Sequence, residues 1–197
     1  MGDNIKISYI NSSKKYEEHY NEKFKFAQLI KVDKKGLIDE AKREVREDNK
    51  LFNEYVKVKY LYENGGMLLD GDFEFINSIN SFFKNDFFIG FSDDKNIASN
   101  IIYTKEANNS TISKILDIIR GEKYDNITDV LSEIVGKDLH ENYNYVLKFD
   151  ENSFIYPYDY FYPIDYERIG KGYTDNIKAI YFSNTQKLNF RQSYKVN

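Results

Sequence analysis

The spacing of apolar and polar residues predicts strands and helices that alternate along the first third of the chain. Residues 5–10 alternate apolar and polar side chains, the period of a half-buried strand, and residues 24–30 predict a second strand. From about Leu37 to Tyr62 the apolar residues recur at helical spacing. This pattern predicts one long helix or two abutting helices that end at Gly65.

A short apolar strand, residues 67–69, follows this helix and ends in Asp70-Gly71-Asp72. The residues beyond it contain several more short apolar segments, and Phe82-Phe83 indicates a helical turn. The further predicted strands are residues 73–76, 87–91, 100–104, 145–149 and 179–182.

Two more helices are indicated by capping residues and helical spacing, at residues 112–119 and 130–135. The predicted caps are Ser110 or Thr111 with Gly121 for the first helix, and Thr128 with Gly136 for the second. An aromatic segment, residues 154–166, holds both prolines of the chain, which we expect to keep it from forming a central strand or a helix.

The order of these elements predicts a single α/β domain over residues 1–197, a mixed sheet flanked by helices. No repeat or linker composition divides the chain. With 41% hydrophobic and 30% charged residues, the composition is that of a folded chain.

Charge and composition narrow the function classes. The net charge of −4 argues against a nucleic-acid partner, so an anionic substrate would need a local metal or a few placed cations. The absence of cysteine excludes thiolate chemistry. Without a leader or a membrane-spanning segment in the sequence, the expected location is cytoplasmic, with the inner face of the membrane as an alternative.

The acidic pair Asp70 and Asp72 has two readings. Asp-Gly is a common hairpin turn, and the tripeptide alone favours that reading. The preceding Gly65-Gly66 and the apolar strand favour a ligand site at a strand end instead. Carboxylates there could hold Mg²⁺ or Mn²⁺ against a departing diphosphate, and Gly71 would let the backbone approach a nucleotide.

The segment 60–72 resembles the L-Y-E-x-G-G-x-Y-L-D-x-D signature of glycosyltransferase family 32, which includes capsular-polysaccharide and mannosyltransferase-like enzymes. Residues 88–91 and 100–102 are also similar to the family. Residues 155–165 resemble its I-Y-P-x-x-Y-F-Y-P-I-D segment. Together these segments span about two thirds of the chain.

The resemblance implies a GT-A fold, a Rossmann-like sheet whose DXD motif holds a nucleoside-diphosphate sugar through Mn²⁺ or Mg²⁺. It implies that Asp72 binds the metal, that Asp70 faces the ribose and sugar, and that the anomeric configuration is retained. The remaining donor-binding residues that we infer from the aligned segments are Glu54, Tyr55, Lys57, Gly65, Gly66 and Asn100. The implied partners are a sugar donor, a carbohydrate or glycoconjugate acceptor and a membrane-bound polysaccharide assembly.

Three features depart from the family pattern. Residues 53–57 replace S-D-Y-x-R, so that Glu54 and Lys57 stand for Asp and Arg, and Lys lacks the forked geometry of Arg. The loop after Ile10 is not the family's aromatic and glycine-rich loop, so the N-terminal half-site is shortened. The family's metal-proximal His is absent after Ile180, which leaves Ser183 or Asn184 to substitute for it.

These departures keep a second function class open, a catalytically weak or inactive family member that serves as a binding partner. A third class, a toxin-like transferase acting on a protein, has no supporting segment in this chain. His19 and His140 lie outside every matched segment, and we interpret them as ordinary surface or partly buried residues.

Overall fold

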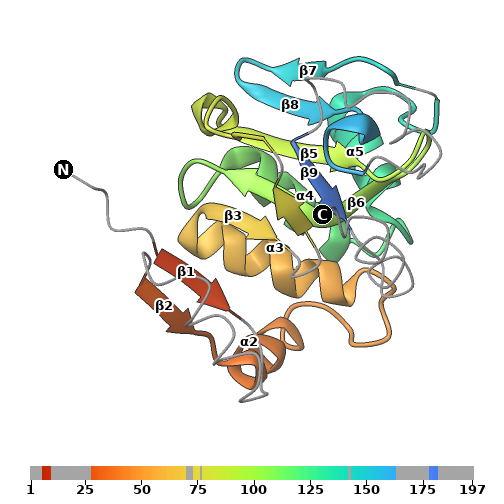
Figure 1. The fold of residues 1–197 in the computed structure, drawn as a ribbon. Helices are drawn as coiled ribbons and strands as arrows, with labels where there is room; N and C mark the ends of the chain where they lie inside the picture. Colours follow the sequence, from red (N-terminus) through yellow and green to blue (C-terminus); the bar gives the residue numbers. More distant parts are fainter. Residues whose placement is uncertain are drawn as a thin grey trace, which may run out of the picture. The chain divides into compact units, whose positions relative to one another are not determined.

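A computed structural model describes residues 6–9, 28–69, 73–75, 77–141, 143–162 and 178–181. Over these residues the fold is mixed α/β, with a five-stranded mixed sheet and four α-helices (Figure 1). The helices are α2 (Lys34–Ala41), α3 (Phe52–Asn64), α4 (Ser110–Arg120) and α5 (Ile127–Val135). The strands are β1 (Lys6–Tyr9), β2 (Gln28–Lys31), β3 (Gly66–Leu69), β4 (Phe73–Phe75), β5 (Phe87–Phe91), β6 (Ile97–Thr104), β7 (Leu147–Asp150), β8 (Ser153–Tyr156) and β9 (Ala179–Tyr181).

The chain contacts divide into two compact units, residues 1–46 and residues 47–197. The first unit contains a parallel pair, β1 and β2, followed by α2. Both strands were predicted, the second of them from residue 24, and the observed strand begins at Gln28. That the whole chain forms a single domain remains a prediction.

The larger unit is built on a sheet with the strand order β3-β6-β5-β8-β7. The strand pairs β3–β6, β5–β6 and β7–β8 are antiparallel, whereas β5 and β8 are parallel. Helix α3 packs on β3 and β6, α5 packs on β6, and α4 lies against both helices. The sheet is therefore mixed and flanked by helices, as predicted.

The predicted helical segment from Leu37 to Tyr62 is two helices, α2 and α3, separated by turns. Helix α3 ends at Gly65, as predicted, where φ is +66°. A Cβ at this position would also lie 2.9 Å from the backbone nitrogen of Ala107. The positive φ and the short distance to the backbone of Ala107 therefore both favour glycine at position 65.

The N-terminal caps of α4 and α5 differ from the predicted ones. Asn109 caps α4 in place of Ser110 or Thr111, and Asn126 caps α5 in place of Thr128. The hydroxyl of Thr128 instead accepts a hydrogen bond of 2.9 Å from the backbone N–H of Ile97. Thr128 therefore forms a tertiary contact with Ile97 on β6 and does not cap α5.

The expectation that the prolines keep the aromatic segment out of the sheet interior is wrong for its first residues. Strand β8 lies between β5 and β7 and ends directly before Pro157. A proline restricts its own residue and biases the residue before it towards extended backbone. Pro157 therefore ends an interior strand without interrupting its ladder, and η2 (Tyr158–Tyr160) follows.

One hydrophobic cluster joins the sheet to η1 (Phe82–Lys84) and to the segment that follows β8. Phe88 stacks on Tyr103 with ring centroids 5.1 Å apart and on Phe161 at 5.9 Å. Phe82 contacts Tyr156 edge to face at 4.6 Å. The aromatic residues of this cluster are thus used for packing, which fixes the segment 157–162 against the sheet.

Candidate functional site

The carboxyl ends of three strands lie at one edge of the large sheet. Because β3 and β5 both run antiparallel to β6, they point the same way, and β8 is parallel to β5. This carboxyl edge therefore holds the ends of β3, β5 and β8, at Leu69, Phe91 and Tyr156. In open α/β sheets, ligands bind beyond the carboxyl ends of strands.

Strands β3 and β4 flank the acidic pair but are not partners of each other. In the described sheets β3 is hydrogen-bonded to β6, and β4 is hydrogen-bonded to β9. Two strands joined by a two-residue hairpin would share one ladder. The strand pairing therefore does not fit the hairpin reading of Asp70-Gly71 and fits a strand-end site better.

The ladder between β4 and β9 brings two distant parts of the sequence together. Phe73, the first residue of β4, is paired with Tyr181, the last residue of β9. The chain therefore leaves β9, on its way to Ser183 and Asn184, beside the point where it enters β4 after Asp72. This pairing was not evident from the sequence, because more than 100 residues separate the two strands.

The predicted metal ligands Asp70, Asp72, Ser183 and Asn184 lie outside the described residues. Within the described residues, no group of three or more His, Cys, Asp or Glu side chains could hold a metal ion. A metal site of the predicted kind would consist of the hard oxygen donors of these four residues. The metal assignment therefore remains a prediction.

Asn100 lies on β6 close to the end of β3. Leu69 is paired with Ile101, the neighbour of Asn100, and the side chain of Asn100 is half-buried. Here the register between β5 and β6 shifts, because Ile89 pairs with Ile102 whereas Gly90 pairs with Ala98. Such irregularities bend a strand and are frequent beside active sites. The structure thus places Asn100 at the carboxyl edge.

Glu54 and Lys57 lie in the first half of α3, and both are half-buried. Because they are three residues apart, they occupy neighbouring positions on one face of the helix. Figure 1 shows α3 running opposite to β3, so this half of the helix lies towards the carboxyl edge. Tyr55, between them, is fully buried. Its hydroxyl accepts a 2.9 Å hydrogen bond from Nε of Arg120. Tyr55 therefore serves the packing of α3 against α4.

Gly65 and Gly66 lie at the other end of β3. Gly66 begins the strand opposite Thr104, whereas Leu69 ends it, so the glycines are about 10 Å from the carboxyl edge. Both glycines have positive φ, +66° and +96°. These positive φ values explain why glycines form the turn from α3 into β3. A donor-binding role for them remains a prediction.

Asp159 is a residue of the carboxyl edge that the sequence analysis missed. It lies in η2, directly after β8, and its Oδ1 is buried without a hydrogen-bond partner in the described structure. Burial raises the pKa of this carboxyl above its ordinary value, and a hydrogen bond from its own backbone N–H partly offsets the rise. A carboxylate inside a segment of tyrosines and prolines was the only signal available in the sequence.

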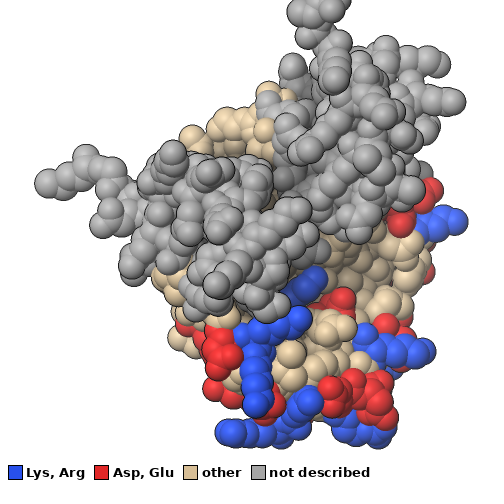
Figure 2. All heavy atoms as spheres, turned by 60° about the horizontal axis from the view of Figure 1, so that its bottom comes forward, with Lys and Arg blue, Asp and Glu red and all other residues tan. Residues whose placement is uncertain are grey.

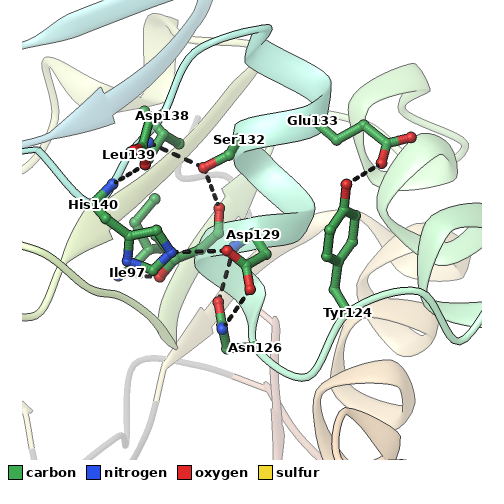
Figure 3. A network of polar contacts seen from close by, with 10 residues as sticks. Ile97, Tyr124, Asn126, Asp129, Ser132, Glu133, Asp138, Leu139 and His140 are labelled. Atoms are coloured by element: carbon green, nitrogen blue, oxygen red, sulfur yellow. Dashed lines mark hydrogen bonds and ion pairs between the residues drawn. The ribbon is translucent and has the colours of Figure 1, made fainter.

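A second polar network, around α5, is shown in Figure 3. Nε2 of His140 lies 2.8 Å from Oδ1 of Asp129, and Nδ2 of Asn126 donates to the other carboxylate oxygen at 2.7 Å. Ser132 Oγ donates to the carbonyl of Thr128 and accepts from Leu139 N–H. These contacts attach the loop after α5 to the helix. His140 therefore lies in a structural network.

The described part of the surface in Figure 2 carries Lys and Arg side chains interspersed with Asp and Glu. An anionic ligand on such a surface would depend on a local cation, because no broad field of one sign is visible on that face. Among the helices of the described residues, none combines the length and apolar character that crossing a bilayer requires.

The fold and the strand-end site together define a mixed α/β protein with a candidate ligand site at the carboxyl edge of its sheet. No protein-family model matches the chain, and no curated protein sequence is significantly similar to it. The resemblance to glycosyltransferase family 32 therefore still depends on the short sequence segments that carry it.

Proposed function

We propose that this chain is a metal-dependent glycosyltransferase of GT-A fold, which moves a sugar from a nucleoside-diphosphate sugar to a polysaccharide or glycoconjugate acceptor. The observation that carries the proposal is the strand pairing around the acidic pair. Leu69 ends β3 at the carboxyl edge, and Phe73 begins β4 opposite Tyr181, so the chain enters β4 beside the point where it leaves β9. This is the arrangement that a site built from Asp70, Asp72, Ser183 and Asn184 requires.

In this proposal Asp72, with Ser183 or Asn184, holds Mn²⁺ or Mg²⁺, and Asp70 faces the ribose and sugar. The metal would supply positive charge to the departing diphosphate. Asn100, on β6 close to the end of β3, and Glu54 and Lys57, in the first half of α3, would orient the donor, since all three lie at or towards the carboxyl edge. Retention of the anomeric configuration rests on the family resemblance alone.

Isothermal titration calorimetry with Mn²⁺ and a panel of nucleoside-diphosphate sugars tests this function. Wild type should bind at least one donor in a Mn²⁺-dependent manner, and Asp72→Asn should weaken that binding by roughly 100-fold. Asp150→Asn is the matched control, because Asp150 is exposed and ends β7 at the opposite edge of the sheet. The proposal fails if wild type binds none of the donors or if Asp72→Asn behaves like wild type.

A binding or partner protein without turnover is the alternative that the site composition favours. Lys57 occupies the position where the family carries an Arg, and the family's metal-proximal His is absent. Hydrolysis of the donor separates the two functions. Release of nucleoside diphosphate by wild type, abolished in Asp70→Ala, would support the enzyme, whereas Mn²⁺-dependent binding without any release would support the partner protein.

A further inference from the structure

A hollow lies at the edge of the large sheet opposite the carboxyl edge. Strands β5 and β8 begin at this edge, whereas β6 and β7 end there. The hollow has a volume of about 430 Å³, and its walls are Asp86 and the segments 105–111 and 150–153. We call it the polar cavity. Its volume falls within the range of small-molecule sites, about 300–1,000 Å³.

Hydrogen bonds of the protein itself join the walls of the polar cavity. The backbone N–H of Lys105 donates to the carbonyl of Asp86 at 3.0 Å, and the N–H of Asp86 donates to the carbonyl of Asn152 at 2.9 Å. The side-chain amide of Asn109 donates to the same Asp86 carbonyl at 3.3 Å. All three walls are therefore held together by the fold, as in a preformed ligand site.

Two hydroxyl groups in the wall of the polar cavity are buried and yet unpaired. Ser153 and Thr111 line the cavity and are only 4% and 3% exposed. Neither hydroxyl forms a hydrogen bond within the described structure, and neither is among its unpaired polar atoms that solvent cannot reach. Since both residues line the cavity, their small exposed area opens into it. A ligand in the cavity therefore has two hydroxyls available for hydrogen bonds.

Carboxylates outnumber cations among the residues that line the polar cavity. Lys105 is the single Lys or Arg in its lining, and its Nζ lies 3.8 Å from Oδ1 of Asp86. Glu106, Asp150 and Glu151 also line the cavity, and the described structure shows no ion pair for any of the three. The cavity is therefore net negative and favours a cationic ligand.

The N-terminus of α4, which borders the cavity, does not reverse this preference. Oδ1 of Asn109 accepts hydrogen bonds from the backbone N–H groups of Thr111 at 2.9 Å and Ile112 at 3.2 Å. These N–H groups, which an anion could otherwise bind, are therefore already paired. Nowhere in the described part of the chain do three or more His, Cys, Asp or Glu side chains form a group that could hold a metal ion. The charge of the cavity thus favours an organic cation.

The other lining residues favour hydroxyl groups on this cation. Ala107 is the single apolar residue in the lining, and the amide side chains of Asn108 and Asn152 belong to it with the hydroxyls of Ser153 and Thr111. Amides and hydroxyls both donate and accept hydrogen bonds, so they suit a ligand that does the same. An alkyl chain would find little apolar surface in this cavity. An amine that carries hydroxyl groups therefore fits better than an alkyl amine.

We propose that the polar cavity binds a small primary amine with several hydroxyl groups, such as an amino sugar. The carboxylates of Glu106 and Glu151 attract its ammonium group, and Ser153 and Thr111 form hydrogen bonds with its hydroxyl groups. The cavity lies at the edge of the sheet opposite the proposed donor site, so this inference does not depend on the proposed function.

A titration followed by ¹H–¹⁵N NMR tests the inference with D-glucosamine and D-glucose, which differ in one ammonium or hydroxyl group. Glucosamine should shift backbone N–H signals in residues 105–111 and 150–153. Glucose should bind about fivefold more weakly, because it lacks the charge that the carboxylates attract. Added salt should weaken the binding of glucosamine for the same reason.

Three variants locate the site. Ser153→Ala should weaken glucosamine binding about fivefold through one lost hydrogen bond. It should not lower the thermal unfolding midpoint, because the hydroxyl has no partner within the described structure. Glu151→Gln should weaken the binding about threefold through the lost charge. Ser99→Ala is the matched control and should behave like wild type, because Ser99 is also 4% exposed but lies on β6 outside the cavity lining.

Three results would overturn the inference. They are the absence of glucosamine-dependent shifts in the cavity walls, equal binding of glucose and glucosamine, and wild-type affinity in Ser153→Ala or Glu151→Gln. If Ser153→Ala proves less stable than wild type, the exposed Glu151→Gln decides alone. Mn²⁺-dependent binding of a sugar nucleotide is measured separately, so failure of this inference and failure of the proposed function are distinguishable.

Discussion

Individual residues of the larger unit show how far residue type alone predicts a role. The glycines at 65 and 66 and the break after α3 follow from local conformation, and the sequence predicted them. Tyr55 lies in a segment that resembles a donor-binding motif, yet it is fully buried and bonded to Arg120. Asp159 belongs to no predicted site, and its unpaired oxygen became visible only once its surroundings were known.

The buried carboxyl of Asp159 predicts a pH dependence of stability. Its folded pKa is raised above the ordinary value of 3.8, so at intermediate pH the folded state holds a proton that the unfolded state has lost. This contribution to stability is full below the ordinary pKa and is lost as pH rises through the folded pKa. An amide at this position does not ionise, so the Asp159→Asn variant does not lose this stability as pH rises.

We therefore expect Asp159→Asn to be more stable than wild type near neutral pH, by about 0.5–1 kcal/mol after allowing for solvent screening of a half-buried group. The difference should shrink towards zero near pH ~4. Urea unfolding at several pH values measures it, with Asp150→Asn expected to follow wild type. A constant difference across the pH range would contradict the assignment of this carboxyl as a destabilising buried charge.

At the scale of elements, apolar periodicity predicted most of the helices and strands, and the errors lie at their ends. Helix α4 is an example, since its predicted cap was Ser110 or Thr111. Asn109 caps it instead, accepting from Thr111 N–H at 2.9 Å and Ile112 N–H at 3.2 Å. Its amide also donates to the carbonyl of Asp86 at 3.3 Å, so the cap attaches the helix to the segment before β5.

Asn109→Ala should destabilise the protein by about 1–2 kcal/mol, because two backbone N–H groups of α4 lose their acceptor and the contact with Asp86 is lost. Asn109→Ser, which keeps a capping oxygen, should recover most of this loss. Chemical denaturation of both variants beside wild type measures the difference. Equal destabilisation by Ala and Ser would show that the tether to Asp86, and not the cap, is the important contact.

At the scale of the whole molecule, the sheet of the candidate site is built entirely within one compact unit. All five strands of the large sheet and helices α3 to α5 belong to residues 47–197, and none of these strands comes from residues 1–46. Buried side chains such as Tyr55, Ile102 and Phe161 are all part of this unit. The unit therefore has a core of its own.

A fragment of residues 47–197 should accordingly fold and unfold cooperatively, with near-ultraviolet circular dichroism like that of the full chain. A shorter fragment of residues 66–197 is the control, because it lacks α3 and with it the buried Tyr55 and Val58. We expect this control to lose cooperative unfolding. If fragment 47–197 kept its secondary structure but lost its near-ultraviolet signal, residues 1–46 would be required for packing.

The sequence by itself determined the α/β class, the positions of most elements and the acidic pair that follows a short apolar strand. These features depend on local patterns of three to twenty residues, which apolar periodicity and turn residues encode directly. Only the tertiary structure decided that β3 pairs with β6 and β4 with β9, that β8 lies inside the sheet, and that Asp159 is buried at its carboxyl edge. Strand pairing and burial depend on which distant segments pack together, and that choice is made by the whole core at once.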